Sequence, residues 1–281
     1  MASISELLKL SAQLQSTSDS PQLDCELLLS HVLEVDRTWL RTWPDHQVSL
    51  SQQALFKSFL DQRIKGTPIA YLVGYRGFWS MDLNVSPDTL IPRPETELLV
   101  EIALQLNLPK HGCGLDLGTG TGAIALALAS ERQDMQWLAV DSQLGAVQLA
   151  KNNCHQQQLS NVSVFQSCWF EAIDADEHKF DLIVSNPPYI AIDDPHLSQG
   201  DVRFEPDSAL VSGADGLDDI KIIVSHSPVF LNSGGWLLLE HGYNQGQAVR
   251  DLMLCAGFSD VATQQDYNKL DRVTLGRWKQ S

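Results

Sequence analysis

The sequence predicts an α/β fold, with a mostly parallel, doubly wound sheet preceded by a small helical domain and a β-hairpin. Three observations lead to this prediction. Apolar runs of strand length alternate with helix-like segments from residue 113 onward, leucines repeat at helical spacing before residue 66, and glycines mix with aromatic residues in 74–85. The chain has 281 residues, which is enough for two domains with their own cores.

The first part of the chain has the signals of three helices. Ser3 and Glu6 have the spacing of a capping box ahead of an apolar leucine stripe. Ser20-Pro21 supplies a cap and a first helical residue for a second helix through 23–33. A third helix is expected from Ser51 up to Gly66.

The stretch GYRGFWSMDLNV over 74–85 is typical of a hairpin, because glycines and aromatic residues replace the helical leucine pattern. We therefore divide the chain into a helical domain over 1–74, a hairpin linker over 75–89 and an α/β domain over 90–281. The α/β domain is expected to open with a helix in IPRPETELLVEIALQL, where a proline near the start and acidic residues in the first turn favour a helix N-terminus.

The α/β domain is expected to contain seven strands. Five are short apolar runs, and the tail over 259–278 supplies two more, including DRVTLGRW. The five runs are CGLDL at 113–117, QWLAV at 136–140, VSVF at 162–165, FDLIVS at 180–185 and GWLLLE at 235–240. Helix-like segments such as GAIALALASER between most of these runs indicate parallel strands with helices on both faces of the sheet.

Composition narrows the class of protein. The formal net charge of −16 disfavours a partner held mainly through its phosphate backbone, so no direct binding of nucleic acid is expected. The five cysteines are scattered without a C-x-x-C pair, which indicates neither a disulfide framework nor a zinc site. We find no secretory signal at the N-terminus and no apolar run long enough to cross a membrane, and we expect a cytoplasmic monomer without membrane contact.

The segment LDLGTGTGAIAL at 115–126 predicts a ligand-binding turn between a strand and a helix. Its glycine-rich part comprises Gly118, Thr119, Gly120, Thr121 and Gly122. Glycines allow a sharp turn and a close approach of the backbone to a ligand. The next strand ends in an aspartate, Asp141, about twenty residues later, where a carboxylate can accept hydrogen bonds from a ribose diol. This pattern fits either a nicotinamide dinucleotide or S-adenosylmethionine.

The segment SNPPYI follows the apolar run of 180–185. If that run lies beside 113–117 where the strand order reverses, SNPPYI and the glycine turn face the same crevice. Pro187 favours an extended Asn186, so the Asn186 amide oxygen and the Pro187 carbonyl can both accept from a substrate amino group, and Tyr189 can stack on a planar substrate. The sequence thus predicts a receptor for a planar NH2 group beside a nucleoside cofactor.

These motifs together resemble the class I methyltransferases that methylate planar nitrogens, and within them the bacterial release factor glutamine methyltransferases. The resemblance covers essentially the whole chain and includes LIPRPETELLVE, SNPPYI, RFEPDSALVSGADGL and the N-terminal LDCELLLSHVL. It implies transfer of a methyl group from S-adenosylmethionine to N5 of the glutamine in the Gly-Gly-Gln motif of peptide chain release factors, with S-adenosylhomocysteine as product and no metal. It also implies that residues 1–74 recognise the substrate.

Carried over to this sequence, the resemblance assigns three sets of residues. Cofactor contacts fall on Gly118, Thr119, Gly120, Thr121, Gly122, Asp141, Trp169 and Asn186. Substrate contacts fall on Asn186, Pro187, Pro188 and Tyr189, and of these Asn186, Pro187 and Tyr189 form the catalytic set. One departure stands out, because Cys168 occupies the position before Trp169 where the family usually has an acidic residue.

Two features leave alternatives open. The RPETE segment at 93–97 is explained either by a capped helix start or by a role beside the cofactor. The function alternatives are a glutamine methyltransferase for a ribosomal protein, a nucleic-acid amino methyltransferase acting on adenine N6, and a dinucleotide dehydrogenase or nucleotide-binding module. The last pair would explain the glycine turn but would leave SNPPYI without a role.

Overall fold

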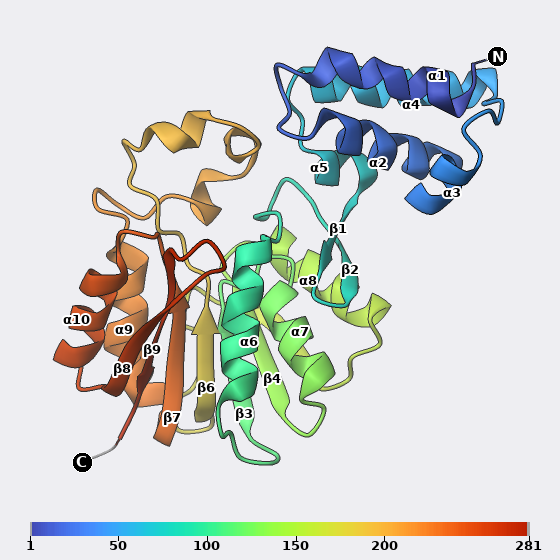
Figure 1. The fold of residues 1–281 in the computed structure, drawn as a ribbon. Coiled ribbons are helices and arrows are strands. Elements are labelled where there is room, and N and C mark those ends of the chain that lie inside the picture. Colours follow the sequence, from blue (N-terminus) through green and yellow to red (C-terminus); the bar gives the residue numbers. More distant parts are fainter. Residues whose placement is uncertain (1, 280–281) are drawn as a thin grey trace. The chain divides into compact units, whose positions relative to one another are not determined.

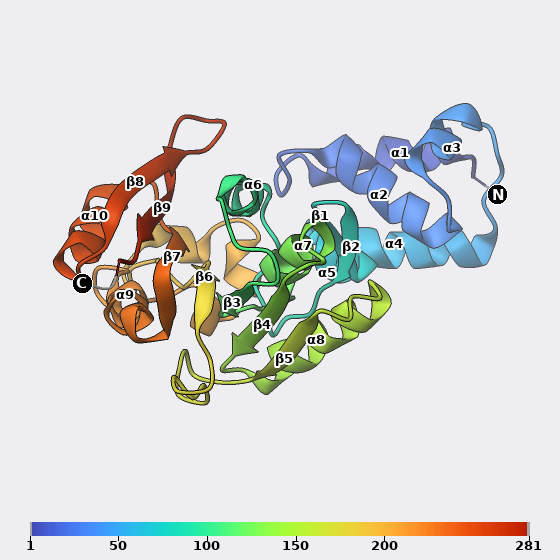
Figure 2. The same cartoon turned by 90° about the horizontal axis from the view of Figure 1, so that it is seen from below.

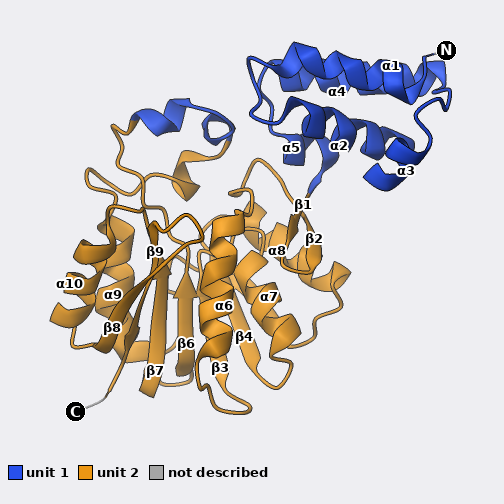
Figure 3. Cartoon of the chain, viewed as in Figure 1, with its two compact units in different colours: residues 1–75, 195–204 blue, residues 76–194, 205–281 orange. Residues whose placement is uncertain are grey.

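The structure is a computed structural model that describes residues 2–279, and the chain divides into two compact units (Figure 3). The first unit consists of Met1–Tyr75 together with Pro195–Phe204, and the second of Arg76–Asp194 together with Glu205–Ser281. The chain therefore contributes to the first unit twice, once at its N-terminus and once through ten residues that follow the SNPPYI segment.

The N-terminal part of the first unit is helical, as predicted (Figure 1). Its elements are α1 (Ile4–Leu8), η1 (Lys9–Leu14), α2 (Pro21–Leu33), α3 (Arg37–Thr42), α4 (Leu50–Ile64) and α5 (Ile69–Val73). The predicted capping box begins α1, because the Ser3 hydroxyl accepts from the Glu6 amide while the Glu6 carboxylate accepts from the Ser3 amide. The short helices α3 and α5 were not predicted.

A buried arginine explains why Pro195–Phe204 belongs to the first unit. Arg63 on α4 is only 6% exposed, and its guanidinium donates to Asp24 over 2.7 Å and to Asp201 over 2.9 Å. A buried guanidinium is stable only when its charge is paired and its N–H groups are hydrogen-bonded. Asp201 supplies part of this pairing from a position 138 residues away in sequence, in the segment that also carries η3 (Pro195–Ser198) and η4 (Val202–Phe204).

The second unit contains a hairpin and a seven-stranded sheet. The hairpin pairs β1 (Tyr75–Phe78) with β2 (Met81–Asn84), as predicted for 74–85. The sheet has the order β5-β4-β3-β6-β7-β9-β8, in which only the pairs made by β9 are antiparallel. Its strands are β3 (Cys113–Leu117), β4 (Gln136–Asp141), β5 (Val162–Gln166), β6 (Phe180–Ser185), β7 (Leu231–Glu240), β8 (Ser259–Gln265) and β9 (Asp271–Arg277).

Helices cover both faces of this sheet (Figures 1 and 2). One face packs against α6 (Glu97–Gln105), α7 (Ala123–Glu131) and α8 (Leu144–Gln156), and the other against α9 (Asp218–Phe230) and α10 (Gly246–Cys255). Two apolar cores result. Side chains alternate between faces along a strand, so the two cores share strands but not residues, as Leu182 and Ile183 of β6 illustrate.

The strand order reverses between β3 and β6, as predicted from the sequence. These two strands are parallel neighbours, with Leu117 of β3 beside Ser185 of β6. The Ser185 hydroxyl also donates to the Leu117 carbonyl over 2.7 Å. The glycine turn and the SNPPYI segment therefore start from adjacent strand ends, where doubly wound sheets bind ligands.

One strand boundary differs from the expected pattern. Strand β7 begins at Leu231 rather than at Gly235, because the paired glycines at 234–235 lie within the strand instead of ending it. No α-helix forms in residues 167–179 between β5 and β6, where the chain makes turns only. Within the described residues, no helix has the length and apolar character needed to cross a membrane.

Candidate active site

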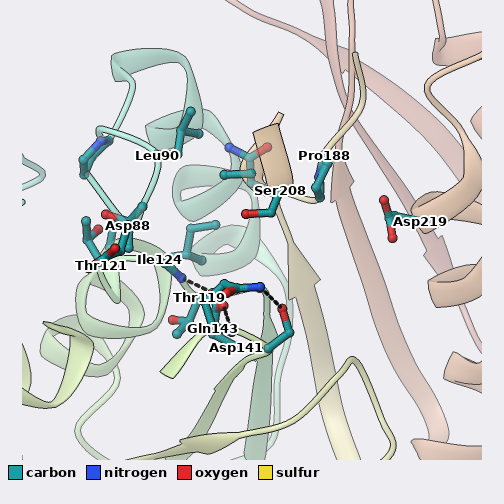
Figure 4. Close-up of a pocket in the computed structure, with 18 of the residues that line it drawn as sticks. Asp88, Leu90, Thr119, Thr121, Ile124, Asp141, Gln143, Pro188, Ser208 and Asp219 are labelled. Atoms are coloured by element: carbon teal, nitrogen blue, oxygen red, sulfur yellow. Dashed lines mark hydrogen bonds between the residues drawn. The ribbon is translucent and has the colours of Figure 1, made fainter. Parts of the chain in front are cut away.

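A cavity of about 240 Å³ lies in the second unit at the carboxyl ends of four parallel strands (Figure 4). The turn after β3 contributes Gly118–Thr121 to its wall, and β4 contributes its last residue, Asp141. Cys168 and Trp169 follow β5, and Asn186 follows β6. The structure therefore brings the predicted glycine turn, the acidic residue and the SNPPYI segment to one cavity.

The glycine turn has a backbone that other residues rarely adopt. Gly118, Gly120 and Gly122 have φ angles of 70°, 56° and 88°, all in the left-handed region that favours glycine. A Cβ atom at Gly118 would lie 3.3 Å from the indole of Trp169, so the absence of a side chain also permits this close packing. Gly118, Thr119, Gly120 and Thr121 line the cavity, whereas Gly122, the residue directly before α7, is not among the lining residues.

Asp141 holds the glycine turn in place. Its carboxylate accepts from the Gly120 amide over 2.9 Å and from the Gln143 amide over 2.9 Å (Figure 4). Burial raises the pKa of Asp141, although these backbone hydrogen bonds favour the ionised form. Since each carboxylate oxygen has two lone pairs, both can still accept from a ligand hydroxyl in the cavity.

A second aspartate, Asp116 on β3, lies beneath the turn and is fully buried. One oxygen accepts from the Thr119 hydroxyl over 2.6 Å and from the Ala125 amide over 3.2 Å. The other oxygen has no hydrogen-bond partner among residues 2–279. Desolvation therefore raises the pKa of Asp116 to about 7, and the charge of Asp141 adds to this effect.

This raised pKa predicts a pH-dependent effect of Asp116→Asn on stability. Below its unfolded-state pKa of 3.8, Asp116 is protonated in both states, and between that value and about 7 only the folded protein retains the proton. The Asp116 contribution to stability is therefore lost as pH rises through this window, by at most about 1.4 kcal/mol per pH unit. We expect urea unfolding to show Asp116→Asn gaining stability relative to wild type between pH 5 and pH 8. A stability difference that does not change with pH would contradict the assignment.

The SNPPYI segment presents only some of its side chains to the cavity. Asn186 and Pro188 line it, and the Asn186 amide NH2 donates to the Thr96 hydroxyl over 3.2 Å. Pro187 and Tyr189 are not among the lining residues. The Tyr189 hydroxyl donates to Glu240 over 3.4 Å, and burial raises the pKa of Tyr189. Stacking of Tyr189 on a substrate stays a prediction.

The backbone of this segment is fixed by the residues that follow it. Ile190 exchanges backbone hydrogen bonds of 2.9 Å with Leu210 and Ser212. The Gln245 side chain donates to the Tyr189 carbonyl over 3.0 Å, and a Cβ at Gly216 would lie only 2.2 Å from that carbonyl oxygen. The match to RFEPDSALVSGADGL therefore has a structural basis, because this segment supports SNPPYI from behind.

The environment of Cys168 includes a carboxylate that the sequence did not reveal. Cys168 lines the cavity next to Trp169, which itself has a left-handed φ of 48°. Asp219, at the start of α9, lines the same cavity, and its charge contributes to a raised pKa of the Cys168 thiol, after burial and Glu171. A carboxylate is therefore present near this part of the wall although position 168 lacks one.

Several other lining residues were missed by reasoning from motifs. They come from the loop before α6 and from the segment after Glu205, and they include Asp88, Thr89, Leu90, Ser208 and Ala209. Figure 4 labels Asp88, Leu90 and Ser208 among them. Glu205 joins these two segments, because its carboxylate accepts from the Ile91 amide over 2.9 Å and pairs with Arg93. Leu90, Ser208 and Ala209 lie within stretches on which the resemblance was based, and that was the available signal. Asp88 and Thr89 precede the first of these stretches.

The described part of the chain contains no cluster of His, Cys, Asp or Glu side chains suited to hold a metal ion. The cavity offers backbone amides, carboxylates, an indole and the primary amides of Gln143 and Asn186. This set can accept hydrogen bonds from hydroxyl and amino groups and can pack against a planar ring.

Comparison with known families gives two matches. Residues 7–74 match the family described as "PrmC N-terminal domain", and residues 94–199 match the one described as "Methyltransferase small domain". Among solved structures, a methyltransferase from Pyrococcus furiosus superimposes with a TM-score of 0.56 at 16% identity, covering 80% of this chain and all of that one. This likeness concerns the fold.

Curated relatives are similar over nearly the full chain. A release factor glutamine methyltransferase of Aliivibrio fischeri is 52% identical over 278 residues, covering 98% of both chains. A protein of the same name from Pseudomonas aeruginosa is 52% identical over 278 residues and covers 99% of both.

Proposed function

Because this chain belongs to the family of release factor glutamine methyltransferases, we propose that it transfers a methyl group from S-adenosylmethionine to N5 of the glutamine in the Gly-Gly-Gln motif of peptide chain release factors. Asn186 is the observation on which this proposal depends most. It places a primary amide at the wall of the cavity, directly after β6 and beside the glycine turn. A nucleotide-binding module would have no use for it.

The residues around the cavity fit S-adenosylmethionine, which supplies an activated sulfonium methyl when bound. We propose that Gly118, Thr119, Gly120, Thr121 and Gly122 form the backbone cradle, that Asp141 accepts from the ribose hydroxyls and that Trp169 packs against the adenine. Support comes from the left-handed glycines, which bring bare backbone to the cavity, and from the position of Asp141 at its wall. We propose that no metal takes part and that S-adenosylhomocysteine is the product.

The chemical difficulty lies in the nucleophile, because an amide nitrogen delocalises its lone pair into the carbonyl. We propose that the Asn186 amide oxygen and the Pro187 carbonyl each accept one N–H of the glutamine amide and so orient its nitrogen toward the methyl group. The same two acceptors stabilise the positive charge that develops on nitrogen, which favours the transition state over the ground state. Pro188 and Tyr189 complete the substrate contact, and the proton leaves to water.

Asp141→Ala is expected to weaken S-adenosylmethionine binding by roughly 1.5–3 kcal/mol, the scale of a lost charged hydrogen bond. The carboxylate also holds the Gly120 amide, so the variant loses both a ligand contact and part of the turn. Isothermal titration calorimetry gives the affinity, and Asp141→Asn, which keeps one acceptor oxygen, should fall between the two. An unchanged affinity in folded Asp141→Ala would remove this residue from the site.

The function itself is tested by mass spectrometry of release factors incubated with the protein and S-adenosylmethionine. One methyl group on the glutamine of the Gly-Gly-Gln motif is the expected product. Calorimetry with S-adenosylmethionine and with NAD separates a methyltransferase from a dehydrogenase. A methyltransferase should bind S-adenosylmethionine but not NAD. Methylation of a ribosomal protein or of DNA, without methylation of release factors, would refute the proposal.

We further propose that the helical domain over 1–74 recognises the release factor and that 90–281 performs the transfer, joined by the hairpin over 75–89. The match of residues 7–74 to a separate family of N-terminal domains supports this division. We propose that the protein acts in the cytoplasm as a monomer and does not bind nucleic acid directly, in keeping with its substrate and with its net charge of −16.

A further inference from the structure

Thr96, in the RPETE segment, has no role in the mechanism above. It is 5% exposed and lines the cavity together with Asn186. It lies directly before α6, where a threonine hydroxyl commonly accepts a hydrogen bond from a free helix amide. The Thr96 side chain makes no such capping bond. A capped helix start therefore does not explain why a threonine is found here.

The Thr96 hydroxyl instead interacts with side chains at the ends of two neighbouring strands. The Asn186 amide NH2, after β6, donates to it over 3.2 Å. The carboxylate of Glu240, the last residue of β7, is its second hydrogen-bond partner. Glu240 is 1% exposed and also accepts from the Tyr189 hydroxyl over 3.4 Å. Burial raises the pKa of Glu240 to about 7, while both hydroxyls favour its ionised form.

The direction of these hydrogen bonds follows from the number of protons available. A threonine hydroxyl has one proton and two lone pairs, and an ionised carboxylate has lone pairs only. When Glu240 is ionised, Thr96 donates to it and has only lone pairs left for Asn186. Asn186 must then turn its NH2 group toward Thr96, which leaves its amide oxygen as the acceptor for a ligand in the cavity.

We propose that Thr96, with its proton held by Glu240, is a positioning residue that fixes the Asn186 amide with its oxygen toward the substrate glutamine. This inference rests on the proposed function, since it concerns how the same site recognises an NH2 group. The opposite orientation of Asn186 would set its own N–H groups against those of the glutamine, and two donors cannot hydrogen-bond each other. Thr96 acts only through Asn186.

Thr96→Val tests this inference, because valine keeps the shape of threonine but has no hydroxyl. In single-turnover methylation of a Gly-Gly-Gln release factor, Thr96→Val is expected to lower the rate by roughly 10–100-fold, the loss for a misplaced polar group in the site. The affinity for S-adenosylmethionine, measured by calorimetry, should change by less than about threefold. Thr96→Ser, which restores the hydroxyl, should recover most of the rate.

A double variant separates positioning from any other role. If Thr96 acts only through Asn186, Thr96→Val should have almost no further effect in an Asn186→Ala background, because coupled residues are not additive. Multiplication of the two rate losses, or an undiminished rate in Thr96→Val, would overturn the inference while leaving the proposed function intact. Failure of Thr96→Ser to recover the rate would also overturn it.

Two controls complete the experiment. Thermal unfolding shows whether Thr96→Val folds, and if it does not, Thr96→Ala carries the same expectation because it removes the hydroxyl without adding volume. The wild-type protein must methylate the release factor in the same assay. If the wild-type protein shows no methylation, the proposed function fails, and this inference fails with it. If only the variants depart from the expected rates, the inference fails and the proposed function stands.

Discussion

Asn186→Ala is expected to lower the turnover of release factor methylation by about 10²–10³-fold, the loss seen when one preorganised polar group that stabilises developing charge is removed. The substitution takes away the amide oxygen that accepts from the glutamine, while the Pro187 carbonyl remains. Asn186 lies at the surface of the cavity and makes one side-chain hydrogen bond, to Thr96. The fold should therefore tolerate alanine, and single-turnover kinetics measures the effect directly.

Asn186→Asp provides the matched control. Both carboxylate oxygens can accept, so this variant should retain more activity than alanine despite the added charge. In both variants, the affinity for S-adenosylmethionine should fall less, relative to the wild type, than the methylation rate does. The reason is that the amide acts mainly on the substrate. Equal turnover of Asn186→Ala and wild type would exclude the amide from catalysis.

The second large effect concerns the acceptor. A release factor in which Gly-Gly-Gln is changed to Gly-Gly-Asn is expected to be methylated about 10²-fold more slowly, because a misplacement of about 1 Å can cost that much in rate. The asparagine amide is one methylene shorter, so it cannot reach the two acceptors and the methyl group together. Mass spectrometry after a fixed incubation quantifies the product on each version.

This comparison distinguishes glutamine recognition from general recognition of an NH2 group. The unmodified release factor is the reference, and the two proteins differ only in the length of one side chain. Equal methylation of the Gly-Gly-Gln and Gly-Gly-Asn release factors would show that the site does not discriminate between the two side-chain lengths. Transfer to DNA with neither protein labelled would instead favour the nucleic-acid alternative.

Local patterns in the sequence predicted much of the fold. The apolar runs corresponding to β3 and β6 marked two strands, and doubly wound topology made them neighbours, as the structure confirms. The capping box of Ser3 and Glu6 located the start of α1. These predictions succeeded because spacing of a few residues suffices to specify such features.

Other features depend on contacts between residues far apart in sequence, and local patterns cannot specify them. The short helices α3 and α5 have six and five residues, too few for a clear apolar period. Asp219 reaches the cavity wall only because α9 packs on the sheet, and the partners of Thr96 lie 90 and 144 positions away. No local spacing of residues in the sequence predicts these contacts.

The two-segment construction of the first unit bears on how such chains can recombine. Arg63 and Asp24 lie in the N-terminal segment, whereas Asp201 lies in Pro195–Phe204, far along the chain. A crossover between two homologous genes near codon 75 would take the guanidinium from one parent and its distant carboxylate from the other. Hybrids would remain intact only where both parents carry a compatible pair, so inheritance should keep positions 63 and 201 together although residues 76–194 of the second unit separate them.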